Sequence, residues 1–471
     1  MLECFIHMNP IIYRWNKRGK IDDPDVVLVQ LTEEKTSYIK QSADRQRILC
    51  VGIGDRKEVT LRRLHLIVRQ VVATAKAQRV KKIAIDFKDF VFSKVPLKNK
   101  ELAEVLGINF DFANFDFVLY KTMPPDGWSF IEEIYIGGSF GIDVEAGIER
   151  GRVIVRAVND ARTLSNTPAG EMTPTRLAES AQAAAEGLPI RVQVLDRDDM
   201  KILKMGGVLG VAQGSSEEPK FIVMEYSGGG KKDKPFVLVG KGVTFDSGGL
   251  NLKPSQHIYE MHMDMSGGSA VINTIALAAR LKLKRNVIAL VPAVENMPSG
   301  SSYRPGDLLR TMSGKTIEVL DTDAEGRVIL SDALTYAEQY QPKLVVDVAT
   351  LTGAAAVALG QRASGIFTKD EKLARLAQEL GEEAGDYVWP LPLWDEFEDE
   401  IKGTFGDWAN VGRTRYGGAS TGAIFLYQFA KNYPWLHIDI APTMTSIDGQ
   451  FLAKGATGVP VRLLLKLLEQ F

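Results

Sequence analysis

Hydrophobic and polar positions in the first part of the chain follow a pattern that is typical of a small α/β domain. Short runs rich in β-branched residues predict buried strands, and the amphipathic stretch from Glu58 to Arg79 predicts a helix. We therefore expect an N-terminal α/β domain over residues 1–145. The strand-like runs are DVVLVQL (25–31), RILCVGIG (47–54) and KKIAIDF (81–87).

A second helical pattern, rich in charged residues, runs from Val144 to Leu164. It ends in the segment SNTPAGEMTP (165–174), whose prolines and glycine interrupt a helix. We place a helical linker at residues 146–170 and expect a larger domain over residues 171–471.

Strand-like and helical patterns alternate throughout this larger domain. Helical segments such as Ser269 to Leu283 and Val328 to Tyr340 separate the apolar runs. This rhythm predicts an α/β fold with a mostly parallel central sheet flanked by helices. The strand-like runs are FIVMEY (221–226), FVLVGKGVTF (236–245), NVIALVPAV (286–294), TIEVL (316–320) and KLVVDVAT (343–350).

Two short motifs resemble nucleotide-binding loops, but both lack a required glycine. The GIG at 52–54 has no third glycine, so it predicts a turn that ends a strand. The SGKT at 313–316 lacks the earlier glycine of a phosphate loop, because Leu309 stands there, and it predicts a hairpin turn. We interpret SGGGKKDK (227–234) as a solvated turn between strands.

Composition limits the classes of protein that fit. With 471 residues the chain exceeds one domain of about 100–200 residues, so two domains are expected. The net charge of −2 provides no long-range field to attract nucleic acid or an anionic membrane, and neither partner is expected. The weakly polar run Val348 to Gly360 is shorter than the ~20 residues of a membrane helix and predicts a buried segment.

The two cysteines and the amino terminus indicate a reducing compartment. Cys4 and Cys50 alone cannot form a disulfide framework or a zinc knuckle. The first residues, MLECFIHMNPIIYRWNKRGK, carry no basic region before an apolar core, as a secretory signal would. We therefore expect a cytoplasmic protein.

Ionisable residues are concentrated in two glycine-flanked segments that follow strand-like runs. Open α/β sheets place their ligand sites at the carboxyl ends of strands. A solvated loop would explain any single acid, but several acids with interleaved basic residues favour a site. The segment 239–268 offers Lys241, Asp246, Lys253 and Asp264, and the segment 319–333 offers Asp321, Asp323, Glu325 and Arg327.

Convergence of these acids predicts a metal centre. Carboxylates at short range must be protonated or neutralised, and two divalent cations would neutralise them. None of the five histidines lies at a convincing ligand spacing, so the site is rich in oxygen and accepts Mn²⁺, Mg²⁺ or Zn²⁺. Lys241 can add a nitrogen ligand, because adjacent dications lower the pKa of an ammonium group.

Five short motifs follow one another in the larger domain: KGVTFDSGG (241–249), MDMSGG (263–268), ENMPSG (295–300), TDAEGR (322–327) and ATLTGA (349–354). In sequence, order and spacing they resemble the motifs of the leucyl aminopeptidase family, also called cytosol aminopeptidases or peptidase family M17. The similarity continues more faintly in ANFDFVLYK (113–121) and NTPAGEMTP (166–174).

The resemblance implies roles for individual residues. Asp246 and Glu325 would bridge two metal ions, Asp323 would bind one ion, and Lys241 and Asp264 would bind the other. Lys253 and Arg327 would form the catalytic pair. The pocket for the first side chain would be lined by Met261, Thr350, Gly353, Ala441 and Met444, together with the backbone carbonyl of Leu351.

One position departs from the family pattern, because Asp321 stands where the family usually has asparagine. The departure adds negative charge beside the expected metal site. By themselves, Met261 and Met444 would be ordinary core methionines.

The implied activity is removal of N-terminal amino acids, preferentially leucine and other apolar residues, by water activated at two Mn²⁺ or Zn²⁺ ions. The resemblance also implies a bicarbonate ion at Arg327 as proton acceptor, Lys253 as stabiliser of the oxyanion, and a homohexamer of two stacked trimers. Two alternatives stay open: another two-metal hydrolase such as a phosphatase, and a non-catalytic scaffold that binds a partner or DNA.

Overall fold

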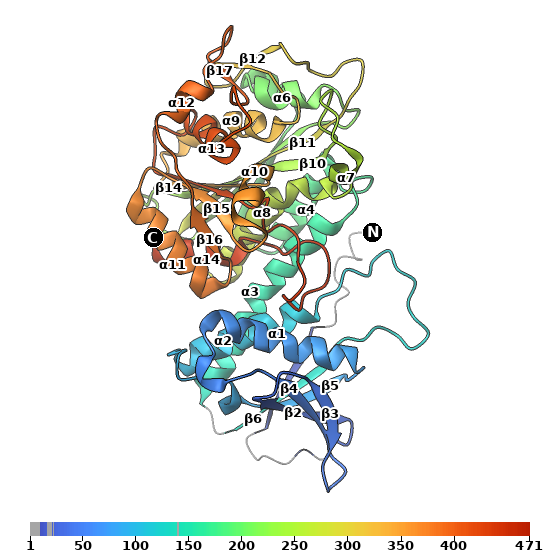
Figure 1. The fold of residues 1–471 in the computed structure, drawn as a ribbon. Helices are drawn as coiled ribbons and strands as arrows, with labels where there is room; N and C mark the ends of the chain where they lie inside the picture. The colour runs from blue at the N-terminus through green and yellow to red at the C-terminus, as the bar shows by residue number, and fades with distance from the viewer. Residues whose placement is uncertain (1–9, 17–20, 22, 139–140) are drawn as a thin grey trace. The chain divides into compact units, whose positions relative to one another are not determined.

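The computed structural model describes residues 10–16, 21, 23–138 and 141–471, so Cys4 and His7 lie outside the described residues. The chain forms two compact units (Figure 1). The smaller unit comprises Met1–Asn159 with Ser446–Lys454, and the larger unit comprises Asp160–Thr445 with Gly455–Phe471. Helix α3 (Ile142–Asn166) contains the division between them. The domain limits expected at residues 145 and 170 stay predictions.

The smaller unit contains a six-stranded sheet in the order β1-β6-β5-β2-β4-β3. All neighbouring strands are parallel except the edge pair β3 and β4. This arrangement confirms the expected α/β unit. Its strands are β1 (Ile12–Asn16), β2 (Val26–Thr32), β3 (Tyr38–Gln41), β4 (Arg47–Gly52), β5 (Lys82–Asp86) and β6 (Glu133–Gly137).

Two long helices, α1 (Leu61–Ala77) and α2 (Asn99–Asn114), contact each other beside this sheet. Helix α1 begins where the Thr60 side chain accepts a hydrogen bond from the backbone of Arg63. Its apolar residues recur at helical spacing and are buried, as the amphipathic pattern predicts. The turn after β4 contains Gly54 at a φ of +73°, which confirms that the GIG motif ends a strand. Short 3-10 turns are η2 (Arg56–Glu58) and η3 (Phe87–Phe90).

The larger unit is built on a nine-stranded sheet in the order β16-β15-β18-β14-β9-β11-β8-β7, with β10 paired to β11. Five of its eight strand pairings are parallel, so the expected mostly parallel sheet is confirmed. The strands are β7 (Ile190–Leu195), β8 (Lys220–Ser227), β9 (Phe236–Gly240), β10 (Gly242–Asp246), β11 (Asn286–Asn296), β14 (Leu344–Ala349), β15 (Ser364–Phe367), β16 (Val388–Pro390) and β18 (Trp435–Asp439).

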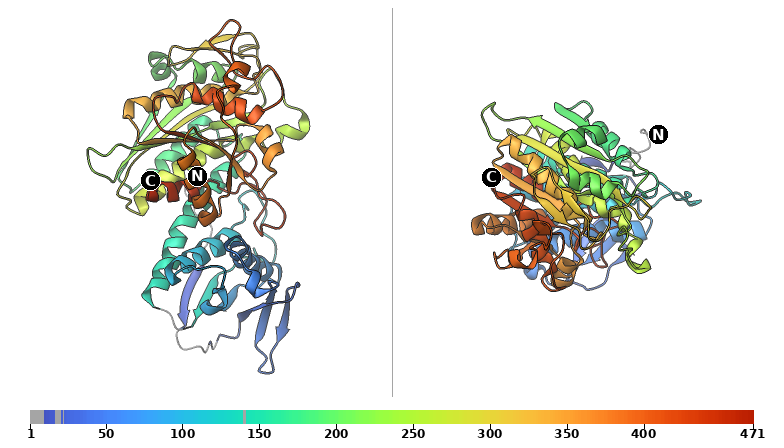
Figure 2. Two further views of the ribbon diagram at one scale, coloured as in Figure 1. Left: turned by 60° about the vertical axis from the view of Figure 1, so that its left-hand side comes forward. Right: turned by 90° about the horizontal axis from the view of Figure 1, so that it is seen from above.

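Helices cover both faces of this sheet (Figures 1 and 2). On one face α6 (Gly206–Ala212) and α13 (Gly418–Tyr427) contact α9 (Glu325–Ala337). On the other face, α8 (Ser266–Arg280) contacts α4 (Pro174–Ala185) and α14 (Val461–Gln470). The remaining helices are α5 (Arg197–Ile202), α7 (Ser255–Ile258), α10 (Gly353–Leu359), α11 (Glu371–Ala384) and α12 (Phe397–Glu400), with 3-10 turns η4 (Met261–Met265) and η5 (Glu338–Tyr340).

The TIEVL run forms a strand, as predicted, but this strand does not join the central sheet, as the expected sheet required. Its strand β13 (Thr316–Glu318) pairs with β12 (Leu308–Arg310) and β17 (Trp408–Ala409) in a separate three-stranded sheet. The connection from β12 to β13 is tight, because the Thr311 N–H donates to Lys315 O at 2.9 Å. The hairpin turn predicted at SGKT is therefore confirmed.

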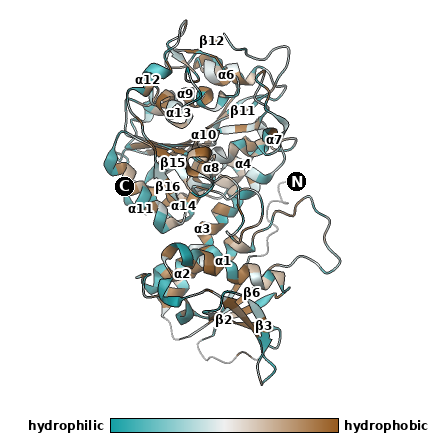
Figure 3. Ribbon diagram, viewed as in Figure 1, coloured by the Kyte–Doolittle hydropathy of each residue, from teal (hydrophilic) through white to brown (hydrophobic). Residues whose placement is uncertain are grey.

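Hydropathy follows burial in both units (Figure 3). Helix α8 is mostly hydrophobic, and every residue in it except Arg280 is buried. The prediction that residues 348–360 are buried is wrong for the second half of the segment. Only Ala355 of α10 is buried there, and Val357 is 89% exposed. Among the described residues, no helix combines the length and the apolar character needed to cross a membrane.

Candidate metal and active site

The site residues of the larger unit lie where neighbouring parallel strands end. Strands β9, β14 and β18 are adjacent and parallel, so their carboxyl ends meet at one edge of the sheet. Lys241 follows β9, Thr350 follows β14, and Asp439 is the last residue of β18. This edge is the position at which open α/β sheets bind ligands.

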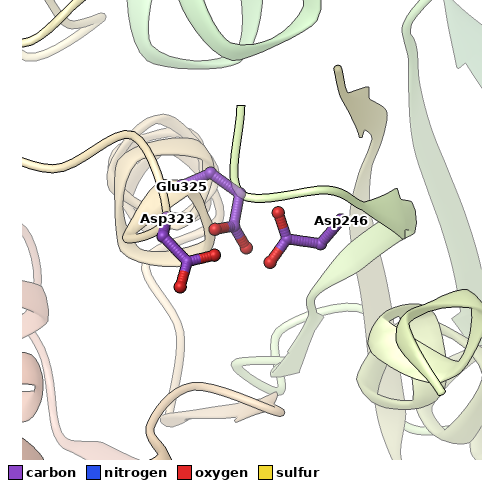
Figure 4. Close-up of side chains that lie close together, drawn as sticks. All are labelled: Asp246, Asp323 and Glu325. Atoms are coloured by element: carbon purple, nitrogen blue, oxygen red, sulfur yellow. The ribbon is translucent and has the colours of Figure 1, made fainter. Parts of the chain in front are cut away.

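Three acids from two distant segments converge at this edge. Asp246 ends β10, Glu325 is the first residue of α9, and Asp323 lies two residues before it. Each offers a carboxylate oxygen, and these atoms all lie within 4.8 Å of one another. The carboxylates point toward one another (Figure 4). The start of α9 favours a negative side chain, because the amino end of a helix carries partial positive charge.

Two lysines lie among the acids. Lys241 Nζ is 2.7 Å from Asp264 Oδ2 and 2.7 Å from Glu325 Oε1. Lys253 Nζ is 2.8 Å from Asp246 Oδ2 and also contacts the Asp323 carboxylate. The seven-residue spacing between Asp246 and Lys253 thus returns the chain to the same cluster. All five predicted metal ligands and Lys253 are brought together.

Burial and neighbouring negative charges both raise the pKa values of the acids in the cluster. Burial raises the pKa of Asp246, and the charge of Glu325 raises it further. Burial also raises the pKa of Asp264 well above its usual range, although Lys241 opposes the shift. Burial and the charge of Asp246 raise the pKa of Asp323 to about 6. Further positive charge at the cluster would favour the ionised form of these acids.

The pKa values of the two lysines are raised, which favours their charged forms. Burial by itself lowers the pKa of Lys241, but the charges of Asp264 and Glu325 outweigh it, so the pKa is raised. For Lys253 burial also lowers the pKa, and Asp246 and Glu325 outweigh it in the same way.

The donor set fits divalent cations. Oxygen atoms of Asp246, Asp323 and Glu325 are close enough to share an ion, and carboxylates suit Mn²⁺, Mg²⁺ and Zn²⁺. The Glu325 side chain is 1% exposed, and its Oε2 has no hydrogen-bond partner among the described residues. A buried carboxylate oxygen without a partner is costly, and a bound cation would satisfy it.

Asn296 supports the metal cluster and was not predicted from the sequence. Its Nδ2 donates to Asp246 Oδ1 at 2.8 Å and to the Thr322 carbonyl at 2.9 Å. The Gly248 N–H donates to the same Asp246 oxygen at 2.9 Å. Asn296 is the last residue of β11 and lies in the ENMPSG motif, paired with Asp246 at the end of β10. Its place in that motif was the sequence signal that could have identified it as a site residue.

Arg327 lies on the first turn of α9, two residues after Glu325, and is 7% exposed. Its NH1 donates to the Asn410 carbonyl at 2.7 Å, and its Nε has no hydrogen-bond partner among the described residues. Burial lowers the pKa of this guanidinium, and the charges of Glu325 and Asp439 oppose that shift. The free Nε and the positive charge fit a small anion.

Asn410 joins Arg327 to the segment that leads to the acids, and sequence reasoning missed it. Its side-chain oxygen accepts from the N–H groups of Leu320 and Asp321 at 2.8 and 3.2 Å. Its Nδ2 donates to the Asp321 carbonyl at 2.6 Å. Asp321 itself is partly buried, and its Oδ1 accepts from the Asp323 N–H at 2.9 Å. No sequence motif marked Asn410.

Three of the predicted substrate-lining residues lie just after the ends of strands β14 and β18. Thr350 Oγ1 lies 2.6 Å from Asp264 Oδ1, and the Thr350 carbonyl accepts from Lys241 at 3.0 Å. Leu351 and Ala441 each donate a backbone N–H to Asp439 at 3.1 Å. Thr350, Leu351 and Ala441 are thus brought to the site.

Three further lining residues lie close to these along the chain. Gly353 is the first residue of α10. Met261 begins η4, three residues before Asp264, and Met444 lies three residues after Ala441. Both methionines are partly buried, so neither is an ordinary core methionine.

Known proteins resemble the chain over nearly its whole length. A relative from Methylobacillus flagellatus named "Probable cytosol aminopeptidase" is 42% identical over 431 residues, which cover 90% of this chain and 85% of the relative. A relative of the same name from Roseiflexus castenholzii is 41% identical over 444 residues, covering 92% of this chain and 89% of the relative.

A solved structure, "Bottromycin maturation enzyme BotP", matches with a TM-score of 0.84 and 30% identity over 95% of this chain and 99% of that chain. A second solved structure, "Bottromycin maturation enzyme BotP in complex with Mn", matches with a TM-score of 0.83 and 30% identity over the same shares of the two chains.

Two parts of the chain match the domains of one family. Residues 34–124 match the N-terminal domain of the cytosol aminopeptidase family, and residues 159–465 match its catalytic domain. With the converging acids and lysines at the sheet edge, these matches show that the chain belongs to the cytosol aminopeptidase family.

Proposed function

We propose that this chain is a metal-dependent aminopeptidase that removes N-terminal amino acids from peptides, preferentially leucine and other apolar residues. Family membership supports aminopeptidase activity. The observation that carries the metal-dependent mechanism is the convergence of Asp246, Asp323 and Glu325 within 4.8 Å, with a buried Glu325 oxygen that has no hydrogen-bond partner among the described residues.

The proposed ligands are Lys241, Asp246, Asp264, Asp323 and Glu325, holding two Mn²⁺ or Zn²⁺ ions. Two ions bound there would supply Lewis acidity toward the scissile carbonyl and would lower the pKa of a bound water. The Mn complex of the structurally similar BotP supports Mn²⁺ as one candidate. To act as a ligand, Lys241 has to lose its proton, since an ammonium group has no lone pair.

Lys253 is the proposed stabiliser of the oxyanion. Its side chain is 13% exposed and that of Lys241 is 4% exposed, so Lys253 is the more accessible of the two lysines. Its raised pKa keeps the ammonium charged at neutral pH. A fixed positive charge at that place stabilises negative charge that develops on the carbonyl oxygen during attack.

Arg327 is the proposed binding group for a bicarbonate ion. Its NH1 is held by the Asn410 carbonyl, and its Nε is left for an anion. Bound bicarbonate would supply the proton acceptor that no histidine of the cluster provides. A methyl group on Gly422 would lie 3.3 Å from Arg327 NH2 and 3.1 Å from Thr352 Cγ2, so glycine there keeps this space open.

The proposed selectivity for the amino end depends on the metal ions. One of the two ions would hold the free α-amino group of the substrate. An acylated amino group would bind a metal ion poorly, because its nitrogen lone pair is delocalised into the amide.

The proposed assembly is a homohexamer in the cytoplasm. Large apolar side chains of the larger unit are exposed in the single chain, including Tyr259 at 83%, Phe405 at 81% and Val357 at 89%. Such side chains favour burial between copies of the chain. Analytical ultracentrifugation tests this proposal, and a monomer at micromolar concentration would contradict it.

The test of the proposed function is release of leucine from an unblocked leucyl peptide, beside the N-acetylated peptide as control. We expect loss of activity after chelation, recovery with Mn²⁺ or Zn²⁺, and no cleavage of the blocked peptide. Equal cleavage of both peptides would contradict selectivity for the amino end. Hydrolysis of phosphate esters alone would indicate a phosphatase, and no hydrolysis in any metal state would indicate a scaffold.

A further inference from the structure

Asp439 is a fully buried carboxylate, 0% exposed, that accepts hydrogen bonds from three residues at the edge of the site. Its Oδ1 accepts from the backbone N–H groups of Leu351 and Ala441, both at 3.1 Å. Its Oδ2 accepts from the Thr352 hydroxyl at 2.7 Å. All three donors therefore converge on one side chain.

These donors belong to two loops that leave adjacent strands. Strands β14 and β18 are parallel, and Ala349 is paired with Asp439 at their ends. Leu351 and Thr352 follow β14, and Ala441 follows β18. Asp439 thus holds the two loops together beyond the last pair of the sheet.

The same carboxylate also fixes the start of α10. The Thr352 hydroxyl, which donates to Asp439, accepts from the Ala355 N–H at 3.1 Å and caps that helix. Gly353, the first residue of α10, directly follows Thr352 in the chain and lies in this capped turn.

A buried carboxylate is an energetically unfavourable way to join two loops. Burial removes the charge from water, which opposes folding, and apolar residues of similar size would pack without that cost. The donors of Asp439 are two backbone amides and a hydroxyl, which are neutral dipoles. Its three directed hydrogen bonds define the positions of the donors, as apolar packing does not.

We infer that Asp439 is a positioning residue that sets the width of the pocket for the first side chain of the substrate. This inference rests on the proposed aminopeptidase function, in which Leu351, Gly353 and Ala441 line that pocket. Asp439 does not touch the substrate in this scheme. It acts through the separation of the two loops, and so it affects discrimination between side chains of different size.

The test compares Asp439→Ala with the conservative variant Asp439→Asn. Alanine removes all three acceptors, whereas asparagine keeps an oxygen that can accept from Leu351 and Ala441 and loses only the bond from Thr352. Asp332→Ala is the matched control, because Asp332 is also fully buried and accepts from the backbone of Val208 at 2.9 Å and Met312 at 2.7 Å. Neither of these hydrogen bonds of Asp332 leads to the lining residues.

The measurements are kcat and KM for alanyl and leucyl substrates, and amide hydrogen exchange of the segments 350–355 and 439–444. For Asp439→Ala we expect the leucine-to-alanine ratio of kcat/KM to fall about tenfold, mainly through KM, as a loosened apolar pocket loses discrimination. Amide protection of both segments should fall as well. Asp439→Asn should recover most of the ratio, and Asp332→Ala should leave it unchanged.

Three results would overturn the inference. The first is an Asp439→Ala enzyme of lowered melting temperature but unchanged substrate ratio, which would show a purely structural role. The second is an equal change of ratio in Asp332→Ala. The third is rapid exchange of the Leu351 and Ala441 amides in the wild type, and this measurement decides the question even if the alanine variant does not fold. Peptide hydrolysis by the wild type tests the proposed function separately.

Discussion

The ammonium group of Lys241 lies 2.7 Å from Oε1 of Glu325, and both side chains are almost completely buried. The two residues come from different segments, one after β9 and the other at the start of α9. The contact places a positive charge among carboxylates that would otherwise repel one another. The charged form of Lys241 therefore supports the cluster electrostatically, and the proposed ligand role would require the loss of that charge.

Asp264→Ala should lose metal. The variant removes one proposed ligand and the partner of Lys241 at 2.7 Å. We expect less bound Mn²⁺ or Zn²⁺ after dialysis, measured by elemental analysis. Because bound metal stabilises the native state by about 2.7 kcal/mol at a hundred times Kd, the metal-dependent rise in melting temperature should shrink at a fixed metal concentration. Asp386→Ala, which removes the partner of Arg462, is the control that should keep its metal.

Lys253→Ala should lose turnover while keeping its metal. The ammonium contacts Asp246 at 2.8 Å but is not a proposed ligand. Loss of one stabilising donor should lower kcat by roughly 10²–10³. Lys402→Ala, which removes an exposed lysine paired with Asp399, should keep normal turnover. A Lys253→Ala enzyme with near-normal kcat would remove this residue from the mechanism.

Asn410→Ala should lower kcat more than it raises KM. The side chain holds the backbone of Leu320 and Asp321, and its carbonyl holds Arg327. Loss of these buried bonds should cost about 1–3 kcal/mol of stability. Displacement of the segment before Asp323 should lower kcat roughly tenfold, since catalytic groups tolerate little misplacement. Unchanged kcat in a folded variant would show that Asn410 has no positioning role.

The raised pKa of Asp332 predicts that stability depends on pH through a group outside the metal cluster. Burial raises its pKa from 3.8 to about 7, although backbone N–H groups oppose the shift. Between pH 4 and 7 the native state therefore binds more protons than the unfolded state, and this group's contribution to stability falls as the pH rises through that window. Above pH 7 the lost contribution is not regained.

Asp332→Asn tests this pH dependence, because asparagine does not titrate. We expect the free energy of unfolding of the variant, measured in urea, to fall less between pH 5 and 8 than that of the wild type. The difference should approach about 1.4 kcal/mol per pH unit within the window. Parallel pH profiles of the two proteins would contradict the shifted pKa.

The sequence alone was sufficient to predict the helices and strands that have a strong local periodicity. The amphipathic stretch became α1, and the charged helical pattern became α3. The glycine-flanked motifs also identified Lys241, Asp246, Asp323 and Glu325 as one set, because several acids interleaved with lysines after strand-like runs are typical of a metal centre. Local spacing carries this information, since one face of a helix or strand depends only on nearby residues.

Tertiary structure decided which strands pair and which side chains meet. TIEVL has the pattern of a central strand, yet it pairs with β12 and β17 in a separate sheet. Helix α10 is apolar in sequence but leaves Val357 exposed, because neighbouring elements cover only one side of it. Asn296, Asn410 and Asp439 belong to ordinary strand ends and loops, and only packing shows which backbone groups their side chains reach. Such contacts depend on strand order and register, which hydrophobic periodicity does not encode.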